Sequence, residues 1–241
     1  MVTGKEMAET AHGRSAADVQ DGAGGVEIWI DGRRSLSAGI VAAVGAACDR
    51  AEECGRRSMV IVHLSGAPEE PLAQDLTVAL VSKWERALRR LERLPAITIA
   101  VADGDCGGLA LDTLLTTDYR IASTGVRLLL PIAAGTTWPG MALYRLARQA
   151  GESAARRAVL LGTPTEAADA LAMHLIDELT DDPASALGAA LEAAARLPGA
   201  ELAIRRQLLT EAPTVSFEDA LGVHLAACDR ALRQAPVEAM P

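Results

Sequence analysis

Aromatic residues are scarce in this chain, since three Trp, two Tyr and one Phe make up only 2% of its 241 residues. Hydrophobic residues still account for 50% of the sequence, so the core must be built from Ala, Leu, Val and Ile. Small aliphatic side chains of this kind favour close packing of helices. The length is sufficient for one domain with a full core, although length alone also allows two.

An excess of basic charge is also lacking. The chain has 23 Lys and Arg against 32 Asp and Glu, which gives a formal net charge of -9. Because nucleic-acid binding requires a basic surface, we expect no nucleic-acid partner, and the acidity serves solubility. No apolar run approaches the length of a membrane-spanning helix, so we expect no membrane partner.

Cysteine and histidine show no spacing typical of a metal site or a disulfide scaffold. The cysteines form no C-x-x-C pair, and none of the four histidines has a second ligand one helical turn away. We therefore expect no metal. In the absence of a signal peptide, the thiols are expected to be free in a reducing compartment, the cytoplasm. The cysteines are Cys48, Cys54, Cys106 and Cys228.

Hydrophobic patterning predicts one α/β domain. Residues 1–24 are polar and aperiodic, and we expect a disordered tail there. Residues 25–185 are expected to form the core domain, in which strands alternate with long helices, so that right-handed crossovers build a mainly parallel sheet. Residues 186–241 are expected to form a C-terminal helical region, whose apolar faces pack on the sheet or on a neighbouring subunit. The expected strands are 26–31, 58–66, 96–103 and 175–180, and the first two helices 37–54 and 76–94.

The segment VADGDCGGLALDTLLTTDYRIAS, residues 101–123, breaks at a cluster of small residues between a strand and a helix. A helix that begins at Gly107-Gly108 has N–H groups without intrahelical acceptors and the positive end of a dipole. Glycine lets a ligand approach the backbone, so an N–H here can form half of an oxyanion hole. Alternatively, the small residues serve only a tight turn, and the glycines alone do not decide.

This segment resembles the crotonase (enoyl-CoA hydratase/isomerase) superfamily, which has V-N-G-x-x-x-G-G-G-x-E-L followed by C-D-x-R-I-A. The similarity continues through RLLLPIAAGTTWPGMALYRLARQAG and LLGTPTEAADALAMHLIDELTDD, and HLSGAPEEPLAQD replaces the family's T-G-x-x-x-x-F-x-A-G-A-D loop. The resemblance covers nearly everything from Val26 onward. It implies a ClpP-like spiral fold of ββα units with a helical C-terminal trimerisation region.

The resemblance also implies roles for single residues. In the family, two backbone N–H groups hold a thioester carbonyl and stabilise an enolate, and the matched motifs put them at Ala73 and Leu109. Because Leu109 replaces the middle glycine of the family's trio, Gly108 is an alternative donor. The first catalytic glutamate corresponds to Asp112 and the second to Ile132, which cannot transfer a proton. Loss of one acid or base typically lowers a rate by about 10²- to 10⁴-fold, so efficient two-glutamate hydration is not expected.

Each of these residues also has a plainer interpretation. Asp112 can simply be an Asp favoured by the helix dipole, and Ala73 an ordinary loop residue. Trp138 either lines an acyl pocket together with Ile132 or belongs to a subunit contact. His63 either faces the site or is a buried histidine with its own partner. Arginines that can meet the phosphates of CoA, or simply lie on solvated helix faces, are Arg33, Arg34, Arg89, Arg90 and Arg93.

Four segments are similar to one branch of the superfamily, the B-type accessory proteins of 3,5-dihydroxyphenylglycine biosynthesis. They are VALVSKWERALRRLERLPA, VADGDCGG, TTWPGMALYRLARQAG and ELAIRRQLL. That pathway supplies a nonproteinogenic amino acid to glycopeptide antibiotics. In it, a type III polyketide synthase builds an acyl-CoA from malonyl-CoA, and crotonase-like proteins assist dehydration and aromatisation to 3,5-dihydroxyphenylacetyl-CoA. A dioxygenase acts afterwards.

Three functions therefore stay open at this point. The chain is an enzyme in which Asp112 aids loss of water from a polyketide-derived thioester, a non-catalytic subunit that activates a crotonase paralogue or the synthase, or a general enoyl-CoA hydratase/isomerase. The resemblance implies an acyl-CoA ligand and no further cofactor. It also implies a homotrimer, a hexamer, or a hetero-oligomer with a paralogue.

Overall fold

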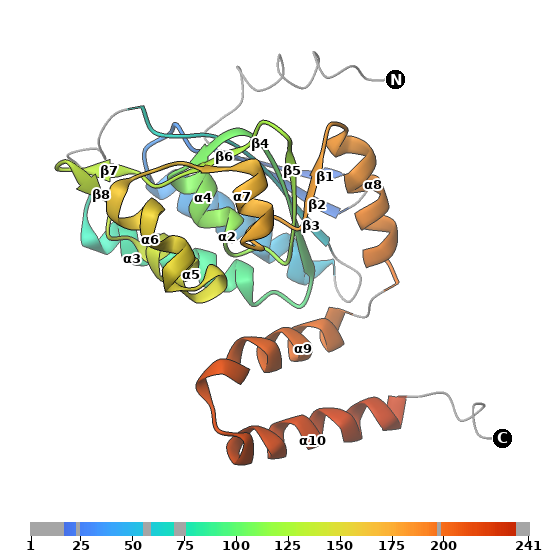
Figure 1. Ribbon diagram of the computed structural model, residues 1–241. Coiled ribbons are helices and arrows are strands. Elements are labelled where there is room, and N and C mark those ends of the chain that lie inside the picture. The colour runs from blue at the N-terminus through green and yellow to red at the C-terminus, as the bar shows by residue number, and fades with distance from the viewer. Residues whose placement is uncertain (1–16, 23–24, 55–58, 70–75, 197–198, 235–241) are drawn as a thin grey trace.

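The computed structural model describes residues 17–22, 25–54, 59–69, 76–196 and 199–234, and the structural statements below refer to these residues. They form a mixed α/β fold in which a twisted sheet carries helices on both faces (Figure 1). No helix among them combines the length and the apolar character needed to cross a bilayer.

The main sheet is largely parallel, as the sequence predicts. Its path runs β1-β2-β3-β4-β5-β10, with only β1 antiparallel to its neighbour, while β6 pairs with β4, and β9 pairs with β6. Two short strands form a separate hairpin. The strands are β1 (Ala17–Gly22), β2 (Gly25–Asp31), β3 (Met59–Gly66), β4 (Ile97–Gly107), β5 (Tyr119–Ser123), β6 (Arg127–Leu129), β9 (Thr165–Glu166) and β10 (Glu178–Thr180), and the hairpin is β7 (Ile132–Ala133) and β8 (Thr136–Thr137).

The helices account for most of the second half of the chain. The first two begin at hydroxyl caps, because Ser37 Oγ accepts a hydrogen bond from the Ile40 N–H and Thr77 Oγ1 accepts one from the Leu80 N–H. The helices are α2 (Ala38–Glu53), α3 (Val78–Glu92), α4 (Leu109–Leu114), α5 (Met141–Ala150), α6 (Glu152–Leu161), α7 (Ala167–Ala172), α8 (Pro183–Ala194), α9 (Gly199–Glu211) and α10 (Phe217–Gln234), with a 3-10 turn at Ala212–Thr214.

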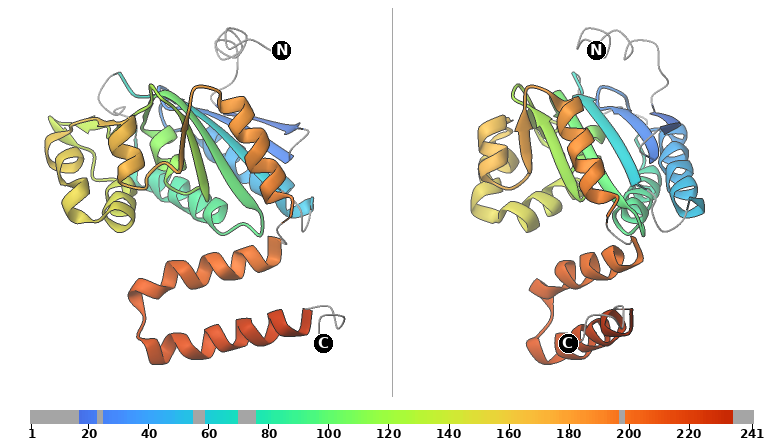
Figure 2. Two further views of the ribbon diagram at one scale, coloured as in Figure 1. Left: turned by 45° about the vertical axis from the view of Figure 1, so that its right-hand side comes forward. Right: turned by 90° about the vertical axis from the view of Figure 1, so that its right-hand side faces the viewer.

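Alternation along the strands divides the core between the two faces of the sheet. Ala100 and Ala122 face the larger cluster with α2, α3 and α4, whereas their neighbours Ile99 and Ile121 pack against α8. This is the period of two expected for a pleated strand. The views in Figures 1 and 2 show α8 alone against its face of the sheet.

Two expected boundaries differ from the structure. Residues 17–22 form β1, paired with β2, so the disordered tail predicted for 1–24 was wrong for this part, and residues 1–16 and 23–24 lie outside the described ranges. The strand was missed because ADVQDG has little apolar character, and its backbone pairing with β2 holds it. The boundary expected at residue 186, between the core domain and the C-terminal helical region, falls within α8, which packs against the sheet.

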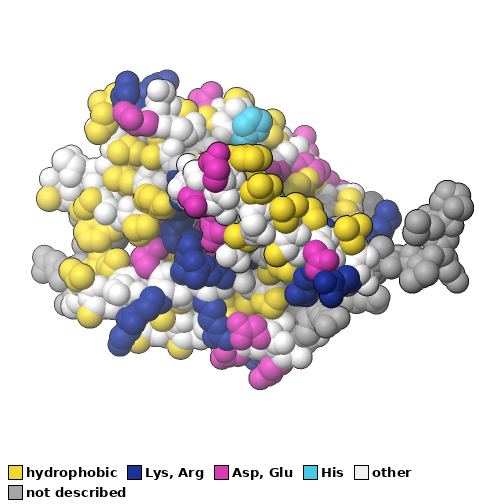
Figure 3. Space-filling model, turned by 90° about the horizontal axis from the view of Figure 1, so that it is seen from below, with side chains coloured by type: hydrophobic (Ala, Val, Ile, Leu, Met, Phe, Trp, Pro, Cys, Tyr) yellow, Lys and Arg dark blue, Asp and Glu magenta, His cyan; other side chains and the backbone are white. Residues whose placement is uncertain are grey.

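Helices α9 and α10 extend from the body as a hairpin (Figure 2). Arg206 of α9 attaches it, because its guanidinium donates to both carboxylate oxygens of Asp118 and to the carbonyls of Leu94 and Ala96. Asp118 in turn accepts hydrogen bonds from the backbone N–H and the hydroxyl of Thr98. The face seen from below carries patches of hydrophobic side chains among charged ones (Figure 3). Exposed large apolar side chains on these helices are Leu209, Phe217, Leu221, Val223, Leu225 and Leu232.

Candidate active site

A cleft of about 640 Å³ lies where β4 passes into α4. Its walls come from the segment after β2, the loop after β3, one side of α3, the first turn of α4 and the segment that precedes α5. Such a volume is within the usual range for a small-molecule site. Among the residues that the structure describes, no group of three His, Cys, Asp or Glu could hold a metal ion.

Asp112 is the acidic residue of α4 that lines this cleft. Its carboxylate is only partly exposed, and its Oδ2 accepts a hydrogen bond of 3.1 Å from the indole N–H of Trp84 on α3. Burial raises the pKa of Asp112 from 3.8 to about 6, opposed by the Trp84 hydrogen bond and by Arg145, and helped by the charge of Glu85. A carboxyl group with such a pKa can both donate and accept a proton near neutral pH.

This raised pKa predicts how stability depends on pH. The folded chain holds the Asp112 proton more tightly than the unfolded chain, so the free energy of unfolding falls as pH rises from about 4 to about 6. Asp112→Asn removes the buried charge and keeps an acceptor for Trp84. We expect it to raise the free energy of unfolding by about 1–2 kcal/mol at pH 7 and to give no gain near pH 4.

Thermal unfolding at the two pH values measures this difference. Asp229→Asn is the matched control, because this carboxylate on α10 is 62% exposed and pairs with Arg233 at 2.9 Å. A loss of stability for Asp112→Asn at pH 7 would contradict a desolvated carboxylate.

The glycines before α4 allow a close approach of backbone segments. A Cβ on Gly107 would lie 2.8 Å from the Ala67 Cβ, and one on Gly108 would lie 2.9 Å from the Pro68 Cγ and 3.2 Å from the Gly32 carbonyl oxygen. Gly108 also has a φ of 53° and a ψ of -124°, which L residues rarely adopt. Tight packing therefore accounts for these glycines. Leu109, the first residue of α4, lines the cleft with an N–H that has no acceptor within the helix.

Gly108→Ala is expected to destabilise the chain by about 1–3 kcal/mol, because backbone strain and the contact with Pro68 add together. Gly104→Ala is the matched control, since Gly104 has a φ of 62° but a Cβ added there would have no neighbour within 4 Å. The control measures the effect of positive φ alone. Chemical denaturation of both variants makes the comparison, and equal losses would show that close approach at Gly108 contributes nothing.

One cleft carboxylate, Glu85, and its partner Arg145 were not found from the sequence. Glu85 of α3 lines the cleft, and its Oε2 accepts a 2.7 Å hydrogen bond from Arg145 of α5, whose side chain is 8% exposed. The other terminal nitrogen of Arg145, Nη1, is buried without a hydrogen-bond partner among the described residues. A signal was present, because Glu85 lies in the apolar stripe of α3 with Val81, Trp84 and Leu88, where a charge requires a reason.

Trp138 and Ile132, predicted to share one pocket, are close in space but line two adjoining hollows. Trp138 lines the cleft with Asp112. Ile132 is 42% exposed on the β7–β8 hairpin and lines a smaller adjoining hollow of about 220 Å³ with Pro68 and Gly162. Ala134 and Gly135, with φ values of 49° and 79°, form the tight turn that joins β7 to β8.

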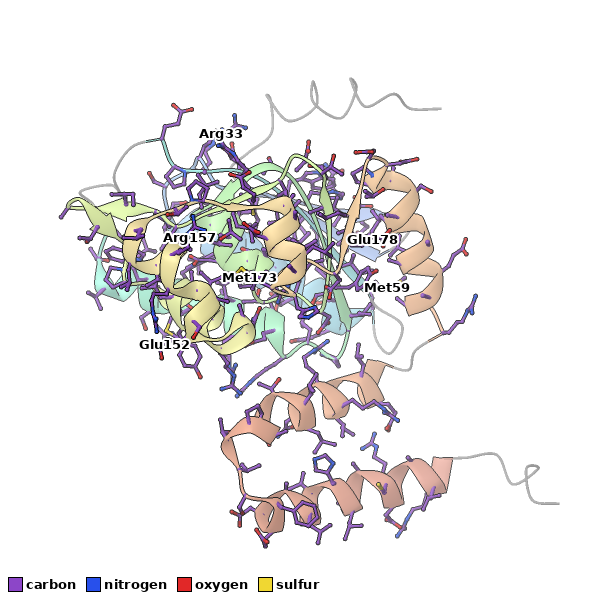
Figure 4. All side chains as sticks on the ribbon, in the orientation of Figure 1. Arg33, Met59, Glu152, Arg157, Met173 and Glu178 are labelled. Carbon is purple, nitrogen blue, oxygen red and sulfur yellow. The ribbon has the colours of Figure 1, made fainter. Side chains whose placement is uncertain are left out.

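Of the arginines considered as phosphate ligands, Arg33 and Arg34 line the cleft and lie beside Asp31. Figure 4 shows Arg33 at the end of the sheet away from α9 and α10. Neither Arg89 nor Arg90 lines it. Arg89 pairs with Glu92, and Arg90 pairs with Glu52 and Asp49. His63 does not line the cleft. Its ring stacks on Trp29 with the ring centroids 4.8 Å apart, and its Nε2 lies 3.3 Å from Glu27 Oε2.

Comparison with known proteins identifies the family. Residues 69–236, more than half of the chain, match the family model described as enoyl-CoA hydratase/isomerase. The chain belongs to this family. An enoyl-CoA-hydratase of Amycolatopsis orientalis is 55% identical over 211 residues, which cover 88% of this chain and 97% of that protein.

Solved structures of enoyl-CoA hydratase/isomerase family members share the fold, at low sequence identity. An enoyl-CoA hydratase/isomerase from Marinobacter aquaeolei superimposes with a TM-score of 0.76 at 16% identity, covering 91% of this chain and 92% of its own. An enoyl-CoA hydratase from Mycobacterium smegmatis gives 0.77 at 17%, covering 92% of both chains. The predicted crotonase fold with a C-terminal helical region is thus confirmed.

Family membership suggests that the cleft is the acyl-CoA site, but it does not place the backbone donor predicted at Ala73. Ala73 lies outside the described residues, whereas Gly108 and Leu109, the other residues predicted for the oxyanion hole, line the cleft. Ile132, predicted to take the place of the family's second glutamate, lines the adjoining hollow. What this enoyl-CoA hydratase/isomerase family member presents in the cleft is the first turn of α4, Asp112, and Glu85, which pairs with the buried Arg145 behind it.

Proposed function

We propose that this chain is the crotonase-like accessory protein of 3,5-dihydroxyphenylglycine biosynthesis, which removes water from a polyketide-derived acyl-CoA on the way to 3,5-dihydroxyphenylacetyl-CoA. Similarity of four sequence segments to that branch of the superfamily supports the pathway. The observation that carries the catalytic part is Asp112, a partly buried carboxyl in the cleft with a pKa of about 6. A group that is protonated in a useful fraction near pH 6–7 can protonate a leaving hydroxyl.

In this proposal the thioester oxygen lies at the start of α4, where the Leu109 N–H stabilises the negative charge of an enolate. Asp112 then gives its proton to the β-hydroxyl, which leaves as water. Aromatisation makes the loss of water strongly favourable. Asp112 can therefore supply the acid of this step, although it is shorter than the family's glutamate, whereas Ile132 leaves removal of the α-proton to another group.

The proposed ligand is an acyl-CoA, and no other cofactor is needed for elimination of water. A type III polyketide synthase supplies the substrate. The proposed assembly is a homotrimer or hexamer, or a hetero-oligomer with a crotonase paralogue, in the cytoplasm. Arg33 and Arg34 at the cleft are suited to CoA phosphates, because their guanidinium groups carry a fixed charge.

A second candidate function is that of a non-catalytic subunit, which stabilises an active paralogue or the synthase. Two observations favour it. Ile132 cannot transfer a proton, and α9 and α10 expose large apolar side chains such as Phe217, Leu225 and Leu232.

Reconstitution tests the proposal. The synthase, malonyl-CoA and a crotonase paralogue are incubated with or without this chain, and 3,5-dihydroxyphenylacetyl-CoA is measured by liquid chromatography and mass spectrometry. We expect product formation to rise when the chain is present. An unchanged yield would overturn the pathway, and dehydration of simple 3-hydroxyacyl-CoA substrates would then indicate a general hydratase. Calorimetry with CoA and acetyl-CoA tests the ligand class separately, and no heat of binding from either would contradict an acyl-CoA site.

A further inference from the structure

Helix α3 places an acidic residue in a stripe that is otherwise apolar. Trp84 is 2% exposed and Leu88 is fully buried, and Glu85, between them on the same side, faces the cleft with a side chain that is 20% exposed. An ion pair in such surroundings adds little stability compared with apolar residues of similar volume. The presence of Glu85 therefore indicates a role for a carboxylate in the cleft.

Arg145 orients this carboxylate. The guanidinium donates to Glu85 Oε2 at 2.7 Å, and one of its nitrogens, Nη1, has no hydrogen-bond partner among the described residues. Glu85 and Asp112 line the same cleft, and the charges of Glu85 and Arg145 act in opposite directions on the pKa of Asp112. The two carboxylates have different partners, since Glu85 pairs with Arg145 and Asp112 accepts a hydrogen bond from Trp84. Different surroundings of this kind separate an acid from a base.

Helix α3 also connects the two carboxylates directly. Trp84 holds Asp112 through its indole N–H at 3.1 Å, and the next residue, Glu85, brings the second carboxylate to the same cleft. The β7–β8 hairpin, which carries the residue at the family's second glutamate position, faces the adjoining hollow instead. A proton carrier on α3 can therefore perform the task that Ile132 cannot.

We propose that Glu85 is the second catalytic carboxylate of this cleft, which removes the α-proton of a β-hydroxyacyl thioester while Asp112 protonates the leaving hydroxyl. This inference rests on the proposed elimination of water. The C–H bond breaks, its proton goes to Glu85, and its electron pair moves to the thioester oxygen as an enolate. The enolate then re-forms the carbonyl, a C=C bond forms, and the C–O bond breaks as the hydroxyl takes the proton of Asp112. Water leaves, and solvent returns the two carboxyl groups to their starting states. Arg145 is a positioning residue for Glu85.

Exchange of the α-proton with solvent separates the two roles. 3-Hydroxybutyryl-CoA is incubated in D₂O with wild-type protein, Glu85→Gln, Glu85→Asp or Asp112→Asn, and α-deuterium and crotonyl-CoA are both measured by mass spectrometry. For Glu85→Gln we expect both exchange and elimination to fall by about 10²-fold or more, with KM within threefold. Glu85→Asp is expected to restore part of the exchange. Asp112→Asn is expected to lose elimination but to keep exchange within about tenfold of the wild-type rate.

Glu92→Gln is the matched control, because it removes an ion-paired carboxylate from the same helix, outside the cleft, and we expect wild-type rates. Wild-type exchange in Glu85→Gln, or loss of exchange only in Asp112→Asn, would overturn the role of Glu85. Absence of exchange in the wild-type protein would overturn it as well. The proposed pathway is decided separately by the reconstitution, so a chain that raises product formation without α-proton exchange would keep its function and lose this mechanism.

Discussion

Asp112→Asn is expected, under the proposed function, to lower the rate of 3,5-dihydroxyphenylacetyl-CoA formation by about 10²- to 10⁴-fold. The amide has no proton to give to a leaving hydroxyl at neutral pH. Its oxygen can still accept the hydrogen bond from Trp84, so the shape of the cleft is kept. The measurement is product formation in the reconstituted system with the synthase and the paralogue, under conditions in which this chain limits the rate.

Asp105→Asn is the control for this prediction. Asp105 lies in the same segment but pairs with Arg127 at 2.7 Å, outside the cleft lining. We expect this variant to keep wild-type output. Unchanged product formation with Asp112→Asn, at preserved oligomer size, would contradict the enzymatic function and favour the non-catalytic subunit. A collapse in output with the oligomer intact would exclude the purely structural role.

Arg145→Ala is expected to lower the free energy of unfolding by about 2–3 kcal/mol, the largest stability effect among the changes considered. Removing one partner of a buried ion pair leaves the other charge uncompensated, a change that typically costs about 3–5 kcal/mol. The expected loss is smaller because the Glu85 side chain is 20% exposed and regains some hydration. For a chain of this size, the midpoint of thermal unfolding should fall by about 4–12 °C.

A second substitution shows whether the unpaired charge is responsible. Glu85→Gln in the Arg145→Ala background is expected to restore part of the lost stability, since it removes the uncompensated carboxylate. Arg156→Ala is the surface control, because its pair with Glu152 is exposed at 57% and 84%, and pairs of this kind contribute about 0–1 kcal/mol. If the double variant is no more stable than Arg145→Ala, the loss arises from packing of the arginine side chain and not from charge.

Local patterns in the sequence were sufficient for the parts of the fold that depend on neighbouring residues. Ser37 as a helix cap, β3 as a central strand and the strand-to-helix turn before Leu109 were all predicted from short segments, and the structure contains each of them. The strand at residues 17–22 was missed, because its pairing with β2 involves backbone groups and leaves no apolar period in ADVQDG.

The candidate site was only partly predictable, because its charges come from distant segments. Glu85 and Arg145 are 60 residues apart, and nothing in either segment points to the other. Asp112 followed from its place in the segment that resembles the crotonase family. Ile132 and Trp138 were expected to line one substrate pocket, whereas Ile132, on a two-residue strand before a tight turn, lines a neighbouring hollow. A motif match gives the position of a residue in the chain but not the space that its side chain faces.

The attachment of α9 by Arg206 links the terminal hairpin to the part of the sheet that supports the site. Asp118, which receives the guanidinium, lies in the connection between α4 and β5 and also binds Thr98 near the start of β4. A shift of α9 would therefore also act on the connection between α4, the helix that carries Asp112, and β5. The Asp118 carboxylate thus connects the terminal hairpin with both ends of the segment that contains α4.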